Sequence, residues 1–104
     1  MLTDENLVLM RAEPSGNGGT QFLYRIKDYG ITAVSYPKED ITQLDWSVDV
    51  VKFKDGDTLK YEICHTTDLA QKTLTFRNDK NLNEFLQKAF DYFKELDTLE
   101  GMMD

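Results

Sequence analysis

Residues 72–96 read KTLTFRNDKNLNEFLQKAFDYFKEL, and the hydrophobic period changes within this stretch. Up to Arg77, apolar and polar residues alternate as they do in a half-buried β-strand, with Leu74 and Phe76 inward. The stretch therefore predicts a strand over Lys72–Arg77 and then an amphipathic helix over about residues 79–100. The apolar residues of that helix follow the three- and four-residue spacing of one face: Leu82, Phe85, Leu86, Ala89, Phe90, Phe93 and Leu96.

Residue types that terminate helices stand at both ends of this segment. Asn78, Asp79 and Asn81 can each cap a helix N-terminus, and Asn81 with Glu84 has the spacing of a capping box. Gly101 is a residue type that commonly follows a helix C-terminus.

The segments before the helix predict a meander of five to seven short strands within about residues 7–77. The first, Leu7–Met10, is a short apolar run that fits a strand or a helix opened by Thr3. We favour the strand, because the next segment offers it a hairpin partner. Pro37 interrupts the sheet, and residues 41–46 have an irregular apolar spacing that suggests a helical turn or a bulged strand.

Two glycine-containing tripeptides predict hairpin loops. Asp28-Tyr29-Gly30 and Lys54-Asp55-Gly56 each place a glycine where a three-residue loop requires a positive φ. The first loop predicts these cross-strand pairs: Lys27 with Ile31, Ile26 with Thr32, Tyr24 with Val34 and Phe22 with Tyr36. The second sets Phe53 opposite Asp57 and predicts an inner face of Val51, Phe53, Leu59, Tyr61 and Ile63.

The order of elements predicts an α+β fold. A strongly bent antiparallel sheet or small barrel would bury one face, with the C-terminal helix closing an open end. Strands followed by one amphipathic helix resemble the pleckstrin-homology (PH) superfold over about residues 7–100. Members that grip inositol phosphates use Lys and Arg around the first strand loop, whereas residues 14–19 carry none. The alternative is an Sm-like small barrel, in which Thr3–Arg11 would be a helix preceding the strands.

Length and composition set the limits of this interpretation. A chain of 104 residues with 40% hydrophobic residues fits a single domain, residues 1–104. The absence of an 18-residue apolar window excludes a membrane-spanning helix, and the acidic first residues argue against a secretory signal. A single cysteine, Cys64, cannot form an internal disulfide, so we expect a cytoplasmic protein.

The net charge of −7 is unevenly distributed. Residues 78–104 contain three Lys and seven Asp or Glu, so they contribute −4, while the strand region is close to neutral. This balance disfavours nucleic-acid binding, which relies on clustered Lys and Arg.

Cys64 and His65 form the only pairing of a nucleophile with an imidazole. Adjacent strand residues point to opposite faces, so the two side chains should diverge instead of forming a catalytic pair. One Cys and one His also fall short of the four ligands of a structural zinc site. Asp55-Gly56-Asp57 lacks the further carboxylates of a calcium loop and is explained by turn chemistry. We therefore expect no catalytic residue, metal or cofactor.

Aromatic residues are the remaining functional signal, with six Phe, five Tyr and one Trp. Tyr29 at a hairpin tip, Trp46 beside the irregular segment and Tyr92 beside the apolar helix stripe are candidate partner-binding residues. The expected function is a non-catalytic binding or assembly module that contacts a protein partner or a second copy. The alternatives are a nucleic-acid-binding Sm-like barrel and a small-molecule binder or enzyme subunit that uses Cys64 or His65.

Overall fold

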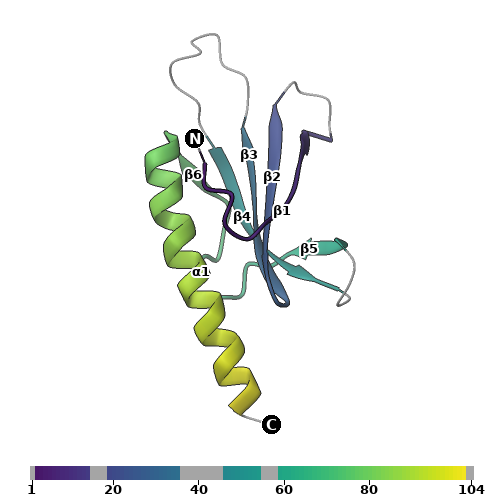
Figure 1. The fold of residues 1–104 in the computed structure, drawn as a ribbon, viewed down its shortest axis with the longest axis vertical. Coiled ribbons are helices and arrows are strands. Elements are labelled where there is room, and N and C mark those ends of the chain that lie inside the picture. The colour runs from purple at the N-terminus through teal and green to yellow at the C-terminus, as the bar shows by residue number, and fades with distance from the viewer. Residues whose placement is uncertain (1, 15–18, 36–45, 55–58, 103–104) are drawn as a thin grey trace.

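The computed structural model describes residues 2–14, 19–35, 46–54 and 59–102, with side chains through residue 96. Within these ranges, six antiparallel strands form one sheet, and a single long helix follows them (Figure 1). The elements are β1 (Leu7–Ala12), β2 (Thr20–Ile26), β3 (Tyr29–Ser35), β4 (Trp46–Phe53), β5 (Tyr61–Ile63), β6 (Leu74–Phe76) and α1 (Asp79–Met102). The α+β class is confirmed, and the segment from Leu7 is a strand, as favoured.

The sheet curls without closing into a barrel. Its order is β1-β2-β3-β4-β5, and β6 pairs with β4 beyond the point where β5 ends. The curl brings β5 over the face of the sheet opposite the helix, where Gln21 Nε2 on β2 donates to the Tyr61 hydroxyl at 2.7 Å. Of the two expected forms, the bent sheet is therefore correct and the barrel is wrong, because β1 and β5 do not pair.

Helix α1 lies along one face of the sheet instead of closing an end (Figure 1). Its N-cap is Asn78, whose Oδ1 accepts the backbone N–H of Asn81 at 2.8 Å. The helix runs through Gly101 to Met102, so Gly101 does not end it. The apolar stripe is buried as expected: Leu82, Leu86, Ala89, Phe90 and Phe93 are inaccessible, and Phe85 is half-buried.

The hairpin between β2 and β3 has a tighter turn than the sequence suggested. Ile26 pairs with Tyr29, which leaves a two-residue loop of Lys27 and Asp28. Lys27 takes a φ of 58° at the first loop position, where hairpin turns favour positive φ. The register is therefore three residues from the predicted one. An odd shift exchanges the faces of a strand, so Thr32 and Val34 lie opposite Leu23 and Gln21, away from Tyr24.

Gly30 lies within β3 and is required there for a different reason. A Cβ at this position would overlap the backbone carbonyl of Tyr24 and approach the Phe53 ring to 2.8 Å. The glycine therefore permits the close approach of neighbouring strands, and the loop does not depend on it.

The register between β4 and β5 also differs from the predicted one. Phe53 pairs with Tyr61 instead of Asp57, which moves the pairing by four residues and preserves the faces. Val51 and Phe53 are buried as expected, but Leu59 and Ile63 are 43% and 48% exposed. The Asp55-Gly56 loop, the Asp55-Gly56-Asp57 tripeptide and the irregular segment after Pro37 lie outside the described residues.

The two faces of the sheet carry unequal cores. Under the helix, Tyr24, Ile31, Ala33, Val48 and Val50 pack against the buried stripe of α1. The opposite face has a small cluster, inside the curl of the sheet, made of Leu23, Val51 and Phe53 with Leu9 and Tyr61 at its margin. Most of the apolar burial, and hence most of the hydrophobic stabilisation, lies between sheet and helix.

Candidate functional site

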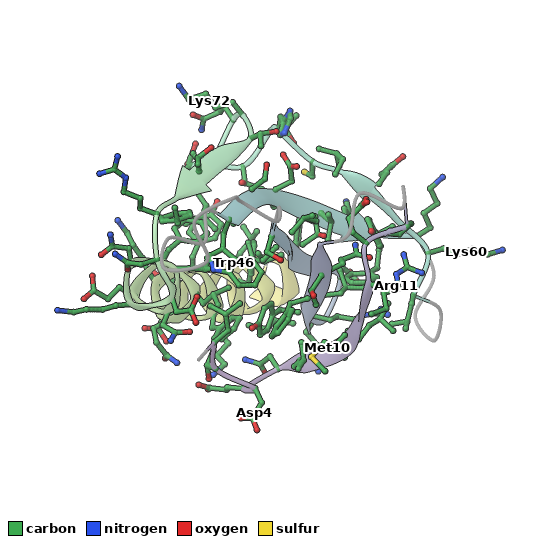
Figure 2. The ribbon with its side chains drawn as sticks, turned by 90° about the horizontal axis from the view of Figure 1, so that it is seen from above. Asp4, Met10, Arg11, Trp46, Lys60 and Lys72 are labelled. Carbon is green, nitrogen blue, oxygen red and sulfur yellow. The ribbon has the colours of Figure 1, made fainter. Side chains whose placement is uncertain are left out.

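An apolar cleft of about 270 Å³ lies where the N-terminal segment, the sheet and the start of α1 meet. In Figure 2, Met10 and Asp4 lie along the N-terminal segment, and Trp46 lies further inside, beside the helix. We name this feature the Trp46 cleft. It is lined by Leu2, Thr3, Asp4, Leu7, Met10, Phe22, Trp46 and Asp79.

A β-bulge in β1 directs two of its side chains to the cleft. Leu7 pairs with Tyr24 and Met10 pairs with Phe22, and the register shifts between Leu7 and Leu9. The extra residue places Leu7 and Met10, three apart in sequence, on the face that carries Tyr24 and Phe22. Met10 is 62% exposed and forms the open apolar wall of the cleft.

Trp46 forms the inner wall of the cleft and is held by two contacts. Its ring meets Phe22 edge to face, with centroids 5.5 Å apart, and its Nε1 donates to Asp79 Oδ1 at 2.8 Å. Asp79 stands in the first turn of α1, so the indole ties the start of β4 to the start of the helix. With only 4% of its surface exposed, Trp46 is a buried wall of the cleft.

The N-terminal segment closes the cleft on the side of the helix. The Thr3 backbone N–H donates to Asn83 Oδ1 at 2.8 Å, and the Thr3 carbonyl accepts the Tyr24 hydroxyl at 2.7 Å. Gln87 Nε2 adds a bond of 2.8 Å to Glu5 Oε2 on the outside. These bonds fasten residues 3–5 to α1 and β2, and the chain then turns at Glu5 and Asn6, where the Leu7 N–H donates to the Asp4 carbonyl at 3.1 Å, before it enters β1.

The electrostatic character of this corner is negative. Of the described residues that line the cleft, two are carboxylates, Asp4 and Asp79, and none is Lys or Arg. Burial, and then the charges of Asp4 and Asp79, raise the pKa of Tyr24 far above its ordinary value. The Tyr24 hydroxyl therefore stays protonated and serves as a donor to Thr3 at neutral pH.

The edge of the sheet beside the cleft has a regular backbone. Among the described strands, β1 pairs with β2 alone, so its other edge presents N–H and C=O groups to no other described strand. From Leu9 to Ala12 the register with β2 is unbroken. Such an edge can pair with an added strand.

The other two predicted partner-binding residues lie away from the cleft, beside the second half of α1. Tyr29 is half-buried and stacks on Phe93 with centroids 5.7 Å apart, and Lys52 Nζ lies 5.4 Å from its ring centroid. The Tyr92 hydroxyl accepts the Asp68 backbone N–H at 3.3 Å and borders a second hollow of about 250 Å³. The structure thus brings Tyr29 and Tyr92 to one helix segment and separates them from Trp46.

Cys64 and His65 point to different surroundings. Cys64 packs at the margin of the helix-side core, and its Sγ lies 3.4 Å from Thr66 Oγ1. His65 Nε2 lies 3.0 Å from Asp49 Oδ1 on the other face of the sheet. Within the described residues the two side chains are therefore not brought together as a nucleophile and a base.

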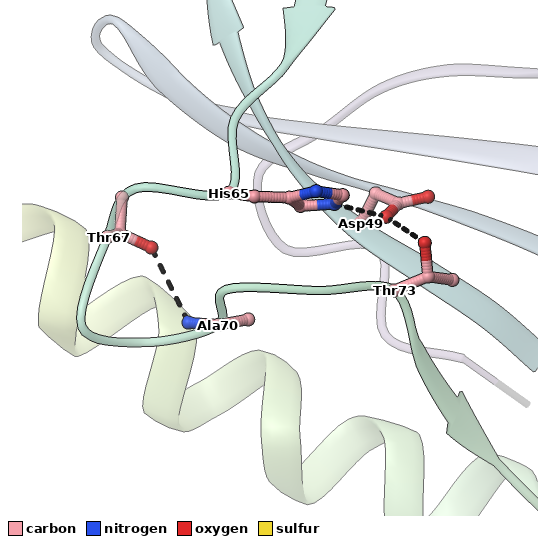
Figure 3. Close-up of polar contacts among 5 residues, drawn as sticks. All are labelled: Asp49, His65, Thr67, Ala70 and Thr73. Carbon is pink, nitrogen blue, oxygen red and sulfur yellow. Dashed lines mark hydrogen bonds and ion pairs between the residues drawn. The ribbon is translucent and has the colours of Figure 1, made fainter.

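Asp49 joins β5 and β6 (Figure 3). Val51 pairs with Ile63, so two residues further along the chain from β5 His65 lies opposite Asp49. Val48 pairs with Leu74, so Thr73, one residue before β6, lies opposite the same aspartate. Thr73 Oγ1 also donates to Asp49 Oδ1, at 2.6 Å. One carboxylate thus holds both ends of the loop between the two strands, and its histidine and threonine are structural partners.

Metal and membrane sites find no support among the described residues. No three His, Cys, Asp or Glu side chains converge there as a metal site would require. Among the described helices, none is long and apolar enough to cross a membrane.

No protein-family model, curated protein or solved structure matches this chain. The function must therefore be inferred from the Trp46 cleft and the β1 edge.

Sequence reasoning identified Trp46 but missed the other walls of its cleft. The sequence pattern indicates Met10 and Phe22 as strand residues and Asp79 as a helix cap, and none of these interpretations points to a cleft. The alternation rule fails at Leu7 and Leu9 because of the bulge, and no Gly or Pro marks that bulge in the sequence. The acidic start of the chain, Asp4-Glu5, was the one available signal for a charged rim.

Proposed function

We propose that this protein is a non-catalytic binding module that takes an extended segment of a partner protein along β1. The observation that carries the proposal is the position of an apolar cleft directly beside an edge strand without a second described partner. An added strand would gain main-chain hydrogen bonds from the edge, and its inward side chain would gain apolar contact in the cleft.

The spacing of side chains along an added strand agrees with the size of the Trp46 cleft. Side chains alternate along a strand, so one residue in two of an added strand points toward the face that carries Met10 and Phe22. A cleft of about 270 Å³ takes a single side chain of the size of Leu or Met and is at the small end for an independent small-molecule site. This favours a peptide over a free metabolite as the occupant.

The finer fold assignment belongs to the same proposal. We infer a PH-like arrangement over an Sm-like one, because the helix follows the strands and residues 7–12 form a strand where an Sm-like chain needs a helix. No step of the binding argument depends on that assignment, since function resides in the site.

The test is a selection of random fifteen-residue peptides on the immobilised protein, followed by affinity measurements on the selected peptides. We expect Met10→Asn to weaken binding about tenfold, because apolar contact of a largely exposed side chain is lost. Ile63→Asn is the matched control, since Ile63 is also an exposed apolar residue but lies on β5, and it should leave the affinity unchanged.

Amide hydrogen exchange locates the bound peptide. Exchange in Leu9–Ala12 should slow when the peptide is bound. The proposal is refuted if the selection yields no binder, or if Met10→Asn and Ile63→Asn affect every binder equally.

A further inference from the structure

The rim of the Trp46 cleft carries charge of one sign. Asp4 is exposed at its outer end and Asp79 is half-buried at its inner end, with apolar side chains between them. In Figure 2, Asp4 extends from the molecule on the side opposite Lys72. An occupant of the cleft therefore meets an apolar surface bounded by carboxylates.

These charges also act on a neighbouring group. Asp4 and Asp79 both act to raise the pKa of Tyr24, in addition to the effect of its burial. Their negative potential therefore extends into the corner behind the cleft as well as into solvent. A cation placed at this rim would be stabilised by the same potential.

We propose that the partner segment carries an apolar anchor residue with Lys or Arg two positions away on one or both sides. This inference rests on the proposed function. Residues two apart in a strand share a face and lie roughly 7 Å from each other, so a cation there reaches the rim when the anchor enters the cleft. Charge complementarity of this kind contributes to partner choice and association rate.

A second copy of this chain does not meet that requirement. If its own β1 served as the added strand with Met10 as anchor, the residues two positions away would be Val8 and Ala12, neither of them cationic. The second copy would also bring its own Asp4 and a net charge of −7. The described surface therefore fits a basic heterologous partner better than self-association.

The experiment uses the tightest peptide from the selection described above, synthesised in three forms with Lys, Gln or Glu two positions from the anchor. We expect the affinity to fall in that order, by about two- to fivefold from Lys to Gln, as for exposed ion pairs. The advantage of Lys should shrink at high salt.

Three charge-neutralising variants identify the carboxylates responsible. Asp4→Asn and Asp79→Asn should each reduce the preference for Lys over Gln, and Asn at position 79 can still accept the Trp46 indole N–H. Asp91→Asn is the control. Asp91 is exposed on α1 about 18 Å along the helix from Asp79, and its substitution changes the net charge by the same amount as the other two.

The outcomes separate the two proposals. Equal affinity of the Lys and Gln peptides, or equal effects of all three variants, overturns the basic-partner inference and leaves the strand-addition proposal standing. Binding of all three peptides that is insensitive to Met10→Asn overturns the strand-addition proposal itself. Concentration-dependent dimerisation through β1 would also contradict the inference.

Discussion

The two edges of the sheet are built differently. At the β1 edge one strand lies beside β2 with an unbroken register from Leu9 to Ala12, and no described strand covers its far side. At the other edge, β4 is covered by two short strands whose connecting loop returns to Asp49. Very short edge strands offer little backbone to another chain, so β5 and β6, of three residues each, protect their side of the sheet, whereas the longer β1 remains available.

The side chains show the same contrast. On β6, Phe76 packs 4.9 Å, centroid to centroid, from Phe85 of the helix, whereas Met10 on β1 is largely exposed. Phe76 thus adds to the core under the helix, whereas Met10 adds apolar surface at the β1 edge. Four predictions test this difference, in order of decreasing effect.

Truncation of one apolar side chain on each edge should have unequal effects on stability. Phe76→Ala should lower the free energy of unfolding by about 2–3 kcal/mol, since a half-buried aromatic contact with Phe85 is lost. Met10→Ala should lower it by less than about 1 kcal/mol. Urea unfolding followed by circular dichroism measures both. Equal losses would show that the β1 edge is as much part of the core as β6.

Removal of the carboxylate at the covered edge should release the loop between β5 and β6. Asp49→Ala leaves His65 and Thr73 without their shared acceptor and should cost about 2 kcal/mol. Asp49→Asn keeps an acceptor oxygen and should cost less. Hydrogen exchange should accelerate in residues 64–73 before it does in β1. Uniform acceleration across the sheet would contradict a local role for Asp49.

Tyr24 tests how the N-terminal segment is fastened beside β1. Tyr24→Phe removes the donor to Thr3 and should cost about 1 kcal/mol at neutral pH. The folded state holds the pKa of Tyr24 above the ordinary value near 10, so the unfolded chain loses this proton first as pH rises. Stability linked to Tyr24 is therefore complete below about pH 10 and declines above it.

Urea unfolding at several pH values checks that sign. The wild type should lose more stability than Tyr24→Phe between about pH 9 and 11, so the difference between the two proteins should shrink there. A constant difference over this range would mean that Tyr24 ionises equally in the folded and unfolded states.

The smallest effect is expected from one hydroxyl at the covered edge. Thr73→Val removes the donor to Asp49 without a large change of shape and should cost about 0.5 kcal/mol. Thr75→Val, two residues along at another exposed position, is the control and should change stability by less. Equal values from differential scanning calorimetry would indicate that the Thr73 bond adds nothing to stability.

Local patterns predicted the elements of this fold better than their pairing. The helix and the strands follow from hydrophobic period, because burial on one face acts on every residue of an element. Registers depend on single turns. Lys27 adopts a positive φ that usually signals glycine, while Gly30 serves a close contact with Tyr24. The predicted pairing, which places Gly30 in the loop, therefore differs from the observed pairing by three residues.

The candidate site was partly predictable for a similar reason. Trp46 stood out by residue type, but Met10 and Asp4 become neighbours of it only through the bulge and the path of the N-terminal segment. Both are tertiary features without a local sequence signature. The divergence of Cys64 and His65, in contrast, followed directly from the alternation of strand residues.

The double pairing of Asp49 has a consequence for chain length. His65 and Thr73 both lie opposite Asp49, and they are eight residues apart in the sequence, which is an even number. Removing residues 65–72 would join β5 to β6 as one uninterrupted strand, with every side chain on its present face. The loop is thus an insertion of even length, which preserves the alternation of faces between β5 and β6. Deletion of an odd number of its residues would turn either Leu74 or Ile63 to the opposite face of the sheet.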